Sequence, residues 1–250
     1  FPYPRRMRLA LVPARLVKAL GLSGLMPRRI RESLALIPER MSEHAIPASI
    51  PSAGAEKCRV GFVSGCVMSV MFGDTHRHSL ELLARAGCTV LTPPEQVCCG
   101  ALHAHGGQLD LARANARRNI EVFEAVRLDR VVINAAGCGS TLKEYGALLA
   151  EDPVWAERAK AFSAKVRDLS ELLVELGGVR TPSKVSLNRR VTFHDACHLA
   201  HAQRITAPPR QLVKSIAGEG YVEMPEPDVC CGSAGSYNLT EPEMAARLQR

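Results

Sequence analysis

Two neighbouring cysteines followed by glycine occur twice in this chain, and this repetition constrains its fold more than any other feature. The first copy reads VCCGALH from Val97, and the second reads VCCGSAGSY from Val229, 132 residues later. A second match joins CRVGFVSGC, which ends at Cys66, to RRVTFHDAC, which ends at Cys197, at a spacing of 131 residues. Two matches at nearly the same spacing predict that the chain contains two copies of one structural unit.

Short apolar strand patterns alternate with helical patterns in the first copy. Strands are expected at residues 60–63 and 90–91 and in the run RVVINAAGC that ends at Cys138, with helices at 79–86 and 109–126. In the second copy, residues 191–193 repeat the first strand. Strands that alternate with helices form parallel sheets through right-handed crossovers. We therefore expect an α/β fold of two duplicated units with parallel sheets, preceded by a basic helical segment.

Composition along the chain predicts four regions. Residues 1–50 form the basic helical segment and a proline-rich linker, and residues 57–150 form the first unit. Residues 151–183 form a helical connection, centred on a helical pattern from about 152 to 176. Residues 184–250 form the second unit, which we expect to continue beyond the sequence given, so that this chain is part of a longer protein.

Charge is concentrated at the amino-terminal end. Residues 1–31 contain eight Lys or Arg and no acidic residue, whereas the net charge of the whole chain is +7. The remainder is close to neutral and only 4% of residues are aromatic, which argues against a nucleic-acid-binding protein. The basic segment is amphipathic, which favours attachment to an anionic membrane surface or an acidic partner. A linker helix packed on its own protein is the alternative.

Seven of the nine cysteines follow the repeat. In the first unit they come just after predicted strands, and the carboxyl ends of parallel strands share one edge of a sheet, where ligands usually bind. Glycines beside them let backbone N–H groups approach sulfur. A set of thiolates suits an iron–sulfur cluster or zinc, and the spacing does not separate the two. The predicted ligands are Cys66, Cys98, Cys99 and Cys138 in the first unit and Cys197, Cys230 and Cys231 in the second.

The other two cysteines, Cys58 and Cys88, lack counterparts in the repeat and are expected to be small core residues. Histidines flank both predicted sites. His194 and His198 are candidates to replace a missing ligand, and the alternative is that they hydrogen-bond to the backbone at the end of a strand and the start of a helix. The same alternative applies to the remaining histidines near the two motifs, His103, His105 and His201.

The expected compartment is the cytoplasm. The sequence contains no uncharged apolar run of about 18 residues and no pattern of a secretory signal peptide. In a reducing compartment, nine cysteines are more readily explained as ligands or redox groups than as a disulfide framework.

Three sequence segments carry a resemblance to a known family. TFHDACHLAHAQ, VCCGSAGSYNL and NAAGCGSTLKEYG resemble the cysteine-rich CCG domain family, which includes the cysteine-rich subunit of heterodisulfide reductase, and within it the iron–sulfur subunits of glycolate oxidase (glycolate dehydrogenase). The resemblance implies a [4Fe–4S] electron-transfer subunit of a 2-hydroxy-acid oxidoreductase. Such a subunit passes electrons from flavin-containing subunits, which oxidise glycolate to glyoxylate, toward a membrane acceptor such as a quinone. It implies a location peripheral to the cytoplasmic face of the inner membrane.

The sequence departs from this family in two places. It has no Cys-x₂-Cys-x₂-Cys-x₃-Cys-Pro run, which the ferredoxin-like domain of full-length relatives carries. Motifs of the heterodisulfide reductase type end in Cys-x-x-Cys and hold a noncubane cluster, but here Cys138 is followed by Gly139, Ser140 and Thr141. Three alternatives remain open: a subunit of a related lactate-utilisation, glycerol-3-phosphate or heterodisulfide system, a zinc-stapled scaffold that docks the flavin subunits, and thiol–disulfide exchange.

Overall fold

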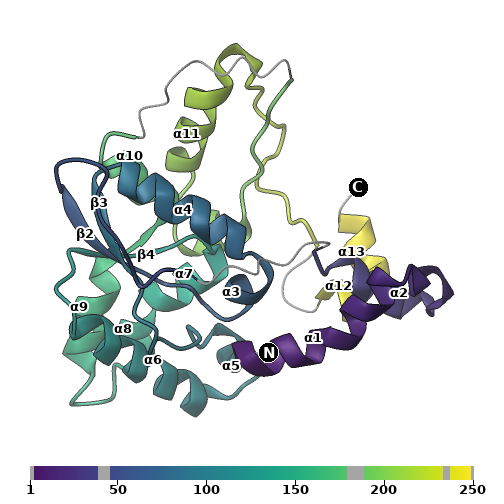
Figure 1. Ribbon diagram of the computed structural model, residues 1–250, viewed down its shortest axis with the longest axis horizontal. Coiled ribbons are helices and arrows are strands. Elements are labelled where there is room, and N and C mark those ends of the chain that lie inside the picture. The colour runs from purple at the N-terminus through teal and green to yellow at the C-terminus, as the bar shows by residue number, and fades with distance from the viewer. Residues whose placement is uncertain (1–2, 39–45, 179–188, 233–236, 249–250) are drawn as a thin grey trace.

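A computed structural model describes residues 3–38, 46–178, 189–232 and 237–248 of the chain. Its centre is a five-stranded sheet in the order β1-β3-β2-β4-β5 (Figure 1). Strands β2, β3, β4 and β5 run parallel, and β1 pairs with β3 in the antiparallel direction. The strands are β1 (Ser49–Ile50), β2 (Cys58–Phe62), β3 (Cys88–Leu91), β4 (Arg130–Ile133) and β5 (Val166–Asp168). The expected α/β fold with a mainly parallel sheet is confirmed.

Helices surround the sheet and extend from it at both ends of the chain. The α-helices of the first half are α1 (Pro4–Ala19), α2 (Arg28–Ala35), α3 (Val67–Met71), α4 (Gly73–Arg85), α5 (Ala101–His105) and α6 (Leu109–Glu124). Those of the second half are α7 (Ala136–Lys143), α8 (Tyr145–Leu148), α9 (Ala156–Lys165), α10 (Leu169–Glu175), α11 (Ala207–Ala217), α12 (Tyr237–Thr240) and α13 (Pro242–Leu248). Three shorter helical turns are η1 (Leu22–Leu25), η2 (His198–Ala202) and η3 (Gly218–Gly220).

Two apolar clusters cover the two faces of the sheet. Val131 and Ile133 point toward Ile120, Phe123 and Phe162 of α6 and α9. Val132 points the other way, into a cluster with residues of α4 and α10, among them Leu80, Leu83 and Leu172. Successive side chains of a strand point to opposite faces of a sheet, and here both faces are covered. The last three residues of β4, Val131, Val132 and Ile133, are therefore all apolar and buried. The core is therefore formed by the first unit together with the connection that follows it.

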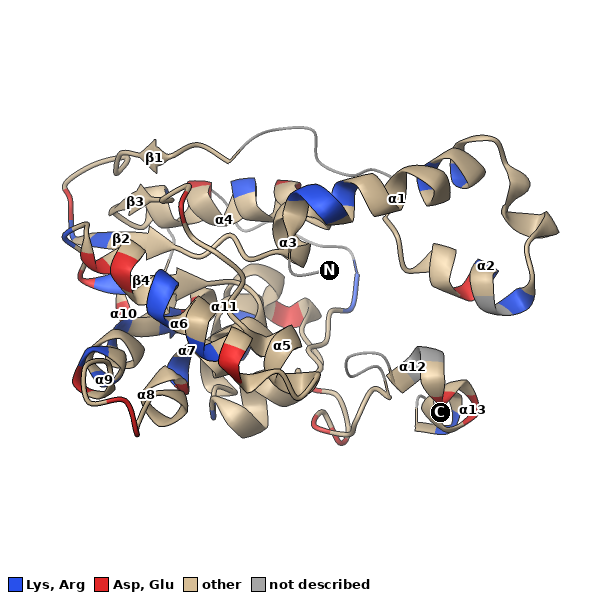
Figure 2. Ribbon diagram, turned by 90° about the horizontal axis from the view of Figure 1, so that it is seen from below, with Lys and Arg blue, Asp and Glu red and all other residues tan. Residues whose placement is uncertain are grey.

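The amino-terminal segment is helical, as expected, and projects from the sheet (Figure 1). Helix α1 is fixed at its start, where Met7 is buried and the ring of Tyr3 lies 6.5 Å from that of His103. Figure 2 shows Lys and Arg along α1 and α2. The described residues contain no helix with the length and apolar composition needed to cross a membrane.

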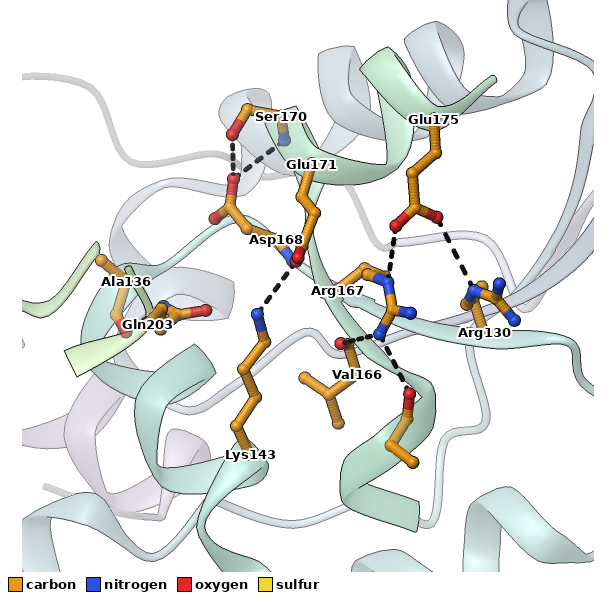
Figure 3. A network of polar contacts seen from close by, with 11 residues as sticks. Arg130, Ala136, Lys143, Val166, Arg167, Asp168, Ser170, Glu171, Glu175 and Gln203 are labelled. Carbon is orange, nitrogen blue, oxygen red and sulfur yellow. Dashed lines mark hydrogen bonds and ion pairs between the residues drawn. The ribbon is translucent and has the colours of Figure 1, made fainter. Parts of the chain in front are cut away.

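The structure differs from the expectation of a purely helical connection over residues 151–183. Strand β5 lies between α9 and α10 and extends the sheet beside β4. The chain turns into α10 through a capping box, in which the Asp168 carboxylate accepts from the Ser170 backbone N–H (2.8 Å) and the Glu171 carboxylate accepts from the Asp168 N–H (3.2 Å), as Figure 3 shows. Residues 179–183 of this connection lie outside the described residues.

The proline-rich linker also contributes a strand. Residues 49–50 form β1 at the edge of the sheet, although residues 39–45 of the linker lie outside the described residues. In the second unit, the strand expected at residues 191–193 forms a single parallel bridge, between Val191 and Tyr221. The described residues of the second unit thus contain a bridge where the first unit contains a sheet, and residues 184–188 at its start are not described.

Candidate metal centre

The four cysteines of the first unit lie at the carboxyl ends of three neighbouring strands. Cys66 follows β2 and begins α3, whereas Cys98 and Cys99 lie in the loop after β3. Cys138 lies in the first turn of α7, shortly after β4. Since β3, β2 and β4 are adjacent in the sheet, the loops that follow them meet at one edge.

The thiols of the first unit contact one another. The sulfurs of Cys66 and Cys98 are 3.5 Å apart, and the Gly100 backbone N–H donates to the Cys98 sulfur at 3.5 Å. The hydrogen bond to Cys98 and burial raise the pKa of Cys66, and contact with Cys138 together with burial raises the pKa of Cys99. The hydrogen bond with Cys66 lowers the pKa of Cys98, but contact with Cys99 and burial outweigh it and bring that pKa to about 11. These thiols are therefore protonated at neutral pH, and any metal that binds them has to displace the protons.

The cysteines of both repeats line one cavity, which we name the cysteine cavity. Its volume is about 390 Å³ and its walls include Cys66, Cys98, Cys99, Cys138, Cys197, Cys230 and Cys231. Cys197 begins η2, and the Gly232 backbone N–H donates to the Cys230 sulfur at 3.4 Å. The expected convergence of the four cysteines of the first unit is confirmed, and the three cysteines of the second unit join them. The role of all seven as ligands stays a prediction.

The second unit reaches this cavity by packing η2 against α7. The Gln203 side chain, which follows η2, donates to the Ala136 carbonyl oxygen at 2.9 Å (Figure 3). A Cβ atom at Gly139 would lie only 2.6 Å from the Gln203 amide nitrogen. A side chain at position 139 would therefore force the Gln203 amide group to move.

Two side chains hold the turn that carries Cys98 and Cys99. The Asn119 amide accepts from the Val97 backbone N–H (2.9 Å) and donates to the Cys98 carbonyl oxygen (3.2 Å). The Tyr145 hydroxyl accepts from the Asn119 amide (3.1 Å) and donates to the Cys99 carbonyl oxygen (2.8 Å). Both side chains are buried. The sequence analysis missed them, although Asn119 is a polar residue on the apolar face of α6, which is a signal for such a role.

Two further polar side chains hold the loops of the first unit: Gln96 connects the loops of Cys66 and Cys98, and His76 connects the loop of Cys66 to Asn134, shortly before Cys138. The Gln96 side chain accepts from the Ser64 backbone N–H (2.9 Å) and donates to the Phe62 carbonyl oxygen (3.1 Å). His76 Nε2 lies 2.7 Å from the Ser64 carbonyl oxygen, and its Nδ1 lies 3.1 Å from the amide nitrogen of Asn134. Burial lowers the pKa of His76, so the ring is neutral and donates through Nε2. The sequence analysis did not single out either residue.

The candidate histidines have different surroundings. His198 and His105 line the cysteine cavity, with ring centres 6.3 Å apart. His194 does not line it, and its Nε2 lies 2.8 Å from the Val229 carbonyl oxygen, a backbone contact of the kind expected in the alternative interpretation. His103 is buried with its Nδ1 3.2 Å from the side-chain oxygen of Gln108, and His201 is exposed.

The two cysteines without repeat counterparts lie apart from the cavity. Cys58 and Cys88 face each other across β2 and β3 and belong to the apolar cluster beneath α4. Burial raises the pKa of Cys58, and burial raises that of Cys88 to about 12. Both are buried core residues, as expected.

The donor set of the cavity is soft. None of its lining residues is a carboxylate, and two backbone N–H groups donate to its sulfurs, as is typical of cysteine-held metal groups. Among the described residues, no three His, Cys, Asp or Glu side chains are arranged to hold a single metal ion as they stand. The thiols line one cavity, and such a donor set suits an iron–sulfur cluster or zinc.

Comparison with known proteins agrees with this donor set. The family model for the cysteine-rich domain named CCG matches residues 60–143 and 191–250, which include all seven cysteines of the cavity. This chain belongs to the CCG cysteine-rich domain family. The two matched ranges correspond to the two repeats found in the sequence of this CCG chain.

Relatives of this CCG chain are named as iron–sulfur subunits and lactate-utilisation proteins. It is 42% identical to the probable glycolate oxidase iron-sulfur subunit of Bacillus subtilis, over 99% of this chain and 59% of that protein. It is 28% identical to the glycolate oxidase iron-sulfur subunit of Escherichia coli, over 95% of this chain and 61% of that protein. It is 34% identical to lactate utilization protein A of Halalkalibacterium halodurans, over 72% of this chain and 73% of that protein. The chain thus spans about three fifths of the length of the first two relatives.

Proposed function

We propose that this chain is the CCG part of an iron–sulfur electron-transfer subunit in a glycolate-oxidising complex. In this proposal, flavin subunits oxidise glycolate to glyoxylate and this subunit passes the electrons toward a membrane acceptor. The observation that carries the proposal is the single cavity lined by all seven repeated cysteines. Glycolate is favoured over lactate because the two relatives named for glycolate oxidase match at least 95% of this chain, whereas the lactate relative matches 72%.

We propose [4Fe–4S] as the type of cluster, with its ligands drawn from the seven cysteines that line the cavity. When bound, such a cluster takes up and releases one electron at a time. A zinc site is the less favoured alternative, because structural zinc needs four ligands about 2.3 Å from one point and the described residues hold no such group. The names of the two glycolate oxidase relatives, which include the term iron-sulfur, support the same choice.

The chain's own residues prepare the site in three ways. The Cys98–Cys99 turn is fixed by Asn119 and Tyr145, so its sulfurs are already positioned toward the cavity. The Gly100 N–H stabilises negative charge on sulfur, which raises the reduction potential of a bound group. Burial of Cys66, Cys98 and Cys99 keeps water from that side of the cavity.

Helix α1 is proposed as the attachment point to an anionic membrane surface. Leu9, Val12, Leu16 and Leu20 lie at spacings of three or four residues and are all more than half exposed. Arg8 and Arg15 lie beside this apolar row on the helix. An exposed apolar row flanked by arginine is typical of a helix that lies in a membrane interface.

Iron analysis of cysteine variants tests the proposed cofactor. The full-length subunit, purified without oxygen, should be brown and contain iron and sulfide. Cys98→Ser and Cys230→Ser should lower the iron content because serine is a poor ligand for soft metals. Cys58→Ser is the matched control, since this buried cysteine lies outside the cavity and should leave the iron content unchanged. A colourless protein with stoichiometric zinc would support the scaffold alternative instead.

Flavin reduction tests the electron-transfer role. In an intact complex with Cys230→Ser, glycolate should still reduce the flavin, but electrons should not reach the acceptor. Loss of both half-reactions would indicate that the cavity only stabilises docking of the subunits. Normal delivery of electrons would contradict the proposed role of the second cysteine pair.

Vesicle flotation tests the proposed attachment. The full-length subunit should float with vesicles that contain an anionic lipid, and raised salt should weaken this binding because exposed charges are screened beyond about 10 Å at 0.1 M. Leu9→Ser with Leu16→Ser should abolish flotation, whereas Leu82→Ser, on the partly exposed side of α4, should leave it unchanged. Equal flotation of the α1 and α4 variants would refute the role of α1.

A further inference from the structure

Two histidines line the cysteine cavity, and the function proposed above gives them no role. Among the described residues that line this cavity, they are the only side chains apart from the cysteines that can donate a hydrogen bond, and none is Lys, Arg, Asp or Glu. His105 is the last residue of α5, and His198 is the first residue of η2. Their ring centres are 6.3 Å apart. Each unit therefore places one imidazole ring at the cavity.

The local structure turns both rings toward the cavity. Ala101 and Leu102, which lie four and three residues before His105, also line the cavity. Residues three or four apart share one face of a helix, so these three side chains form the side of α5 that faces the cavity. His198 directly follows Cys197, which is itself part of the cavity wall. Both rings are therefore available to a group that the cysteines hold.

The two histidines do not belong to the repeated set of cysteines. Cys66 and Cys197 occupy equivalent positions in the two repeats, as do the two pairs of neighbouring cysteines. The position equivalent to His105 holds Tyr237, and the position equivalent to His198 holds Val67. The duplicated donor set is thus made of sulfur atoms alone. The histidines add to this set and do not replace one of its members.

The charge of thiolates indicates what the histidines add. Several thiolates bring negative charge into a cavity whose described walls contain no Lys or Arg, and a buried charge is costly unless hydrogen bonds compensate it. The backbone N–H groups of Gly100 and Gly232 supply two such bonds. A neutral imidazole donates through one ring nitrogen. Hydrogen bonds to sulfur raise the reduction potential of a cluster, because the reduced form carries one more negative charge.

We propose that His105 and His198 donate N–H hydrogen bonds to sulfur atoms of the group that the cysteines hold, and thereby raise its reduction potential. This inference rests on the proposed function, which assigns an iron–sulfur cluster to the cavity. The two donors come from different units. The potential of the cluster therefore depends on docking of the second unit against the first.

Redox titration of the full-length subunit, followed by electron paramagnetic resonance, tests this proposal. The signal that is absent from Cys98→Ser is the one that belongs to the cavity. His105→Phe and His198→Phe keep a flat ring but remove the N–H donor, and each should lower the ratio of reduced to oxidised cluster at a fixed potential about 10-fold, which is about 59 mV for one electron. His105→Gln and His198→Gln keep an N–H donor and should lie closer to the wild type. His201→Phe is the matched control, since this exposed residue of η2 does not line the cavity and should leave the potential unchanged.

Iron analysis separates this role from ligation and from packing of the two rings. Iron content should be normal in all of the histidine variants. Loss of iron from the phenylalanine and glutamine variants alike would overturn the proposal, because it would show that the rings ligate the metal or hold the units together. Normal iron with an unchanged potential in both phenylalanine variants would also overturn it, while the proposed function stands. If iron is absent from the wild type, the proposed function itself fails.

Discussion

Removing the hydroxyl of Tyr145 should destabilise this protein more than the loss of such a small group suggests. The side chain is 0% exposed, and its hydroxyl donates to the Cys99 carbonyl oxygen (2.8 Å) while accepting from the Asn119 amide (3.1 Å). Burial raises the pKa of Tyr145 well above its usual value of 10, so the hydroxyl keeps its proton and donates at every working pH. Tyr145→Phe removes both contacts without changing the shape of the ring.

The magnitude follows from which groups lose a partner. Asn119 keeps its contact with the Cys98 carbonyl oxygen at 3.2 Å, so its amide remains hydrogen-bonded. The Cys99 carbonyl oxygen loses the Tyr145 hydroxyl, and a buried group left without a partner costs about 1–3 kcal/mol. For a chain of 250 residues, each kcal/mol lowers the melting temperature by about 2–4 °C. The expected decrease is therefore about 2–12 °C.

Thermal unfolding followed by circular dichroism measures this decrease, and Tyr221→Phe is the matched control. The Tyr221 hydroxyl donates to the exposed Glu223 carboxylate at 2.8 Å, where water replaces a lost contact. This variant should therefore melt close to the wild type. If both tyrosine variants shift the melting temperature equally, the turn that carries Cys98 and Cys99 does not depend on Tyr145. Iron content should also fall in Tyr145→Phe alone, since the same turn positions two of the proposed ligands.

Three further predictions concern other polar contacts. Burial lowers the pKa of His76 below its usual value of about 6.5, so the unfolded chain binds more protons at this residue than the folded chain. In urea unfolding, the free energy of unfolding should be highest above about pH 6.5 and should decrease as the pH falls, and this decrease should be smaller in His76→Gln. Arg210→Ala leaves the Asp195 carboxylate, 4% exposed, without its bidentate partner at 2.7 Å, and should lower the free energy of unfolding by about 3 kcal/mol. Gly139→Ala should destabilise the wild-type protein but should have little effect in a protein that already carries Gln203→Ala, as measured by a double-mutant cycle. Additive effects of the two substitutions would contradict a clash between the Gln203 side chain and a Cβ atom at position 139.

The sequence predicted the first unit well because its signals are local. The strands at β2 and β3 and the helices at α4 and α6 have the expected apolar spacing, and the expected ranges overlap the observed ones. The place where the cysteines meet then follows from topology, since the carboxyl ends of neighbouring parallel strands lie at one edge. The strand β5 was missed because Val166–Asp168 is only three residues long and follows α9 without a turn signal.

The polar contacts around the site could not be predicted from one sequence. Asn119, Tyr145 and Gln96 all bind backbone groups of loops, and the position of those groups depends on the packing of distant segments. The second unit differs for a related reason. In the first unit β2 has a neighbour on each side, whereas Val191 has a single described partner, Tyr221. A strand pattern in the sequence becomes a strand only where neighbouring strands supply the hydrogen bonds.

The arrangement of the cysteines changes how the duplication is interpreted. Two repeats predict two equivalent sites, one in each unit, but the cysteines of both repeats line one cavity. Four of the thiols come from the edge of the sheet. Cys197 begins η2, which contacts α7 through Gln203, and the loop before Cys230 hydrogen-bonds to His194 and Asp195. The first unit therefore supplies the half of the cavity that is built on the sheet, and docking of the second unit completes the cavity. Consequently, a substitution that weakens this docking should remove metal from the protein while leaving the sheet of the first unit folded.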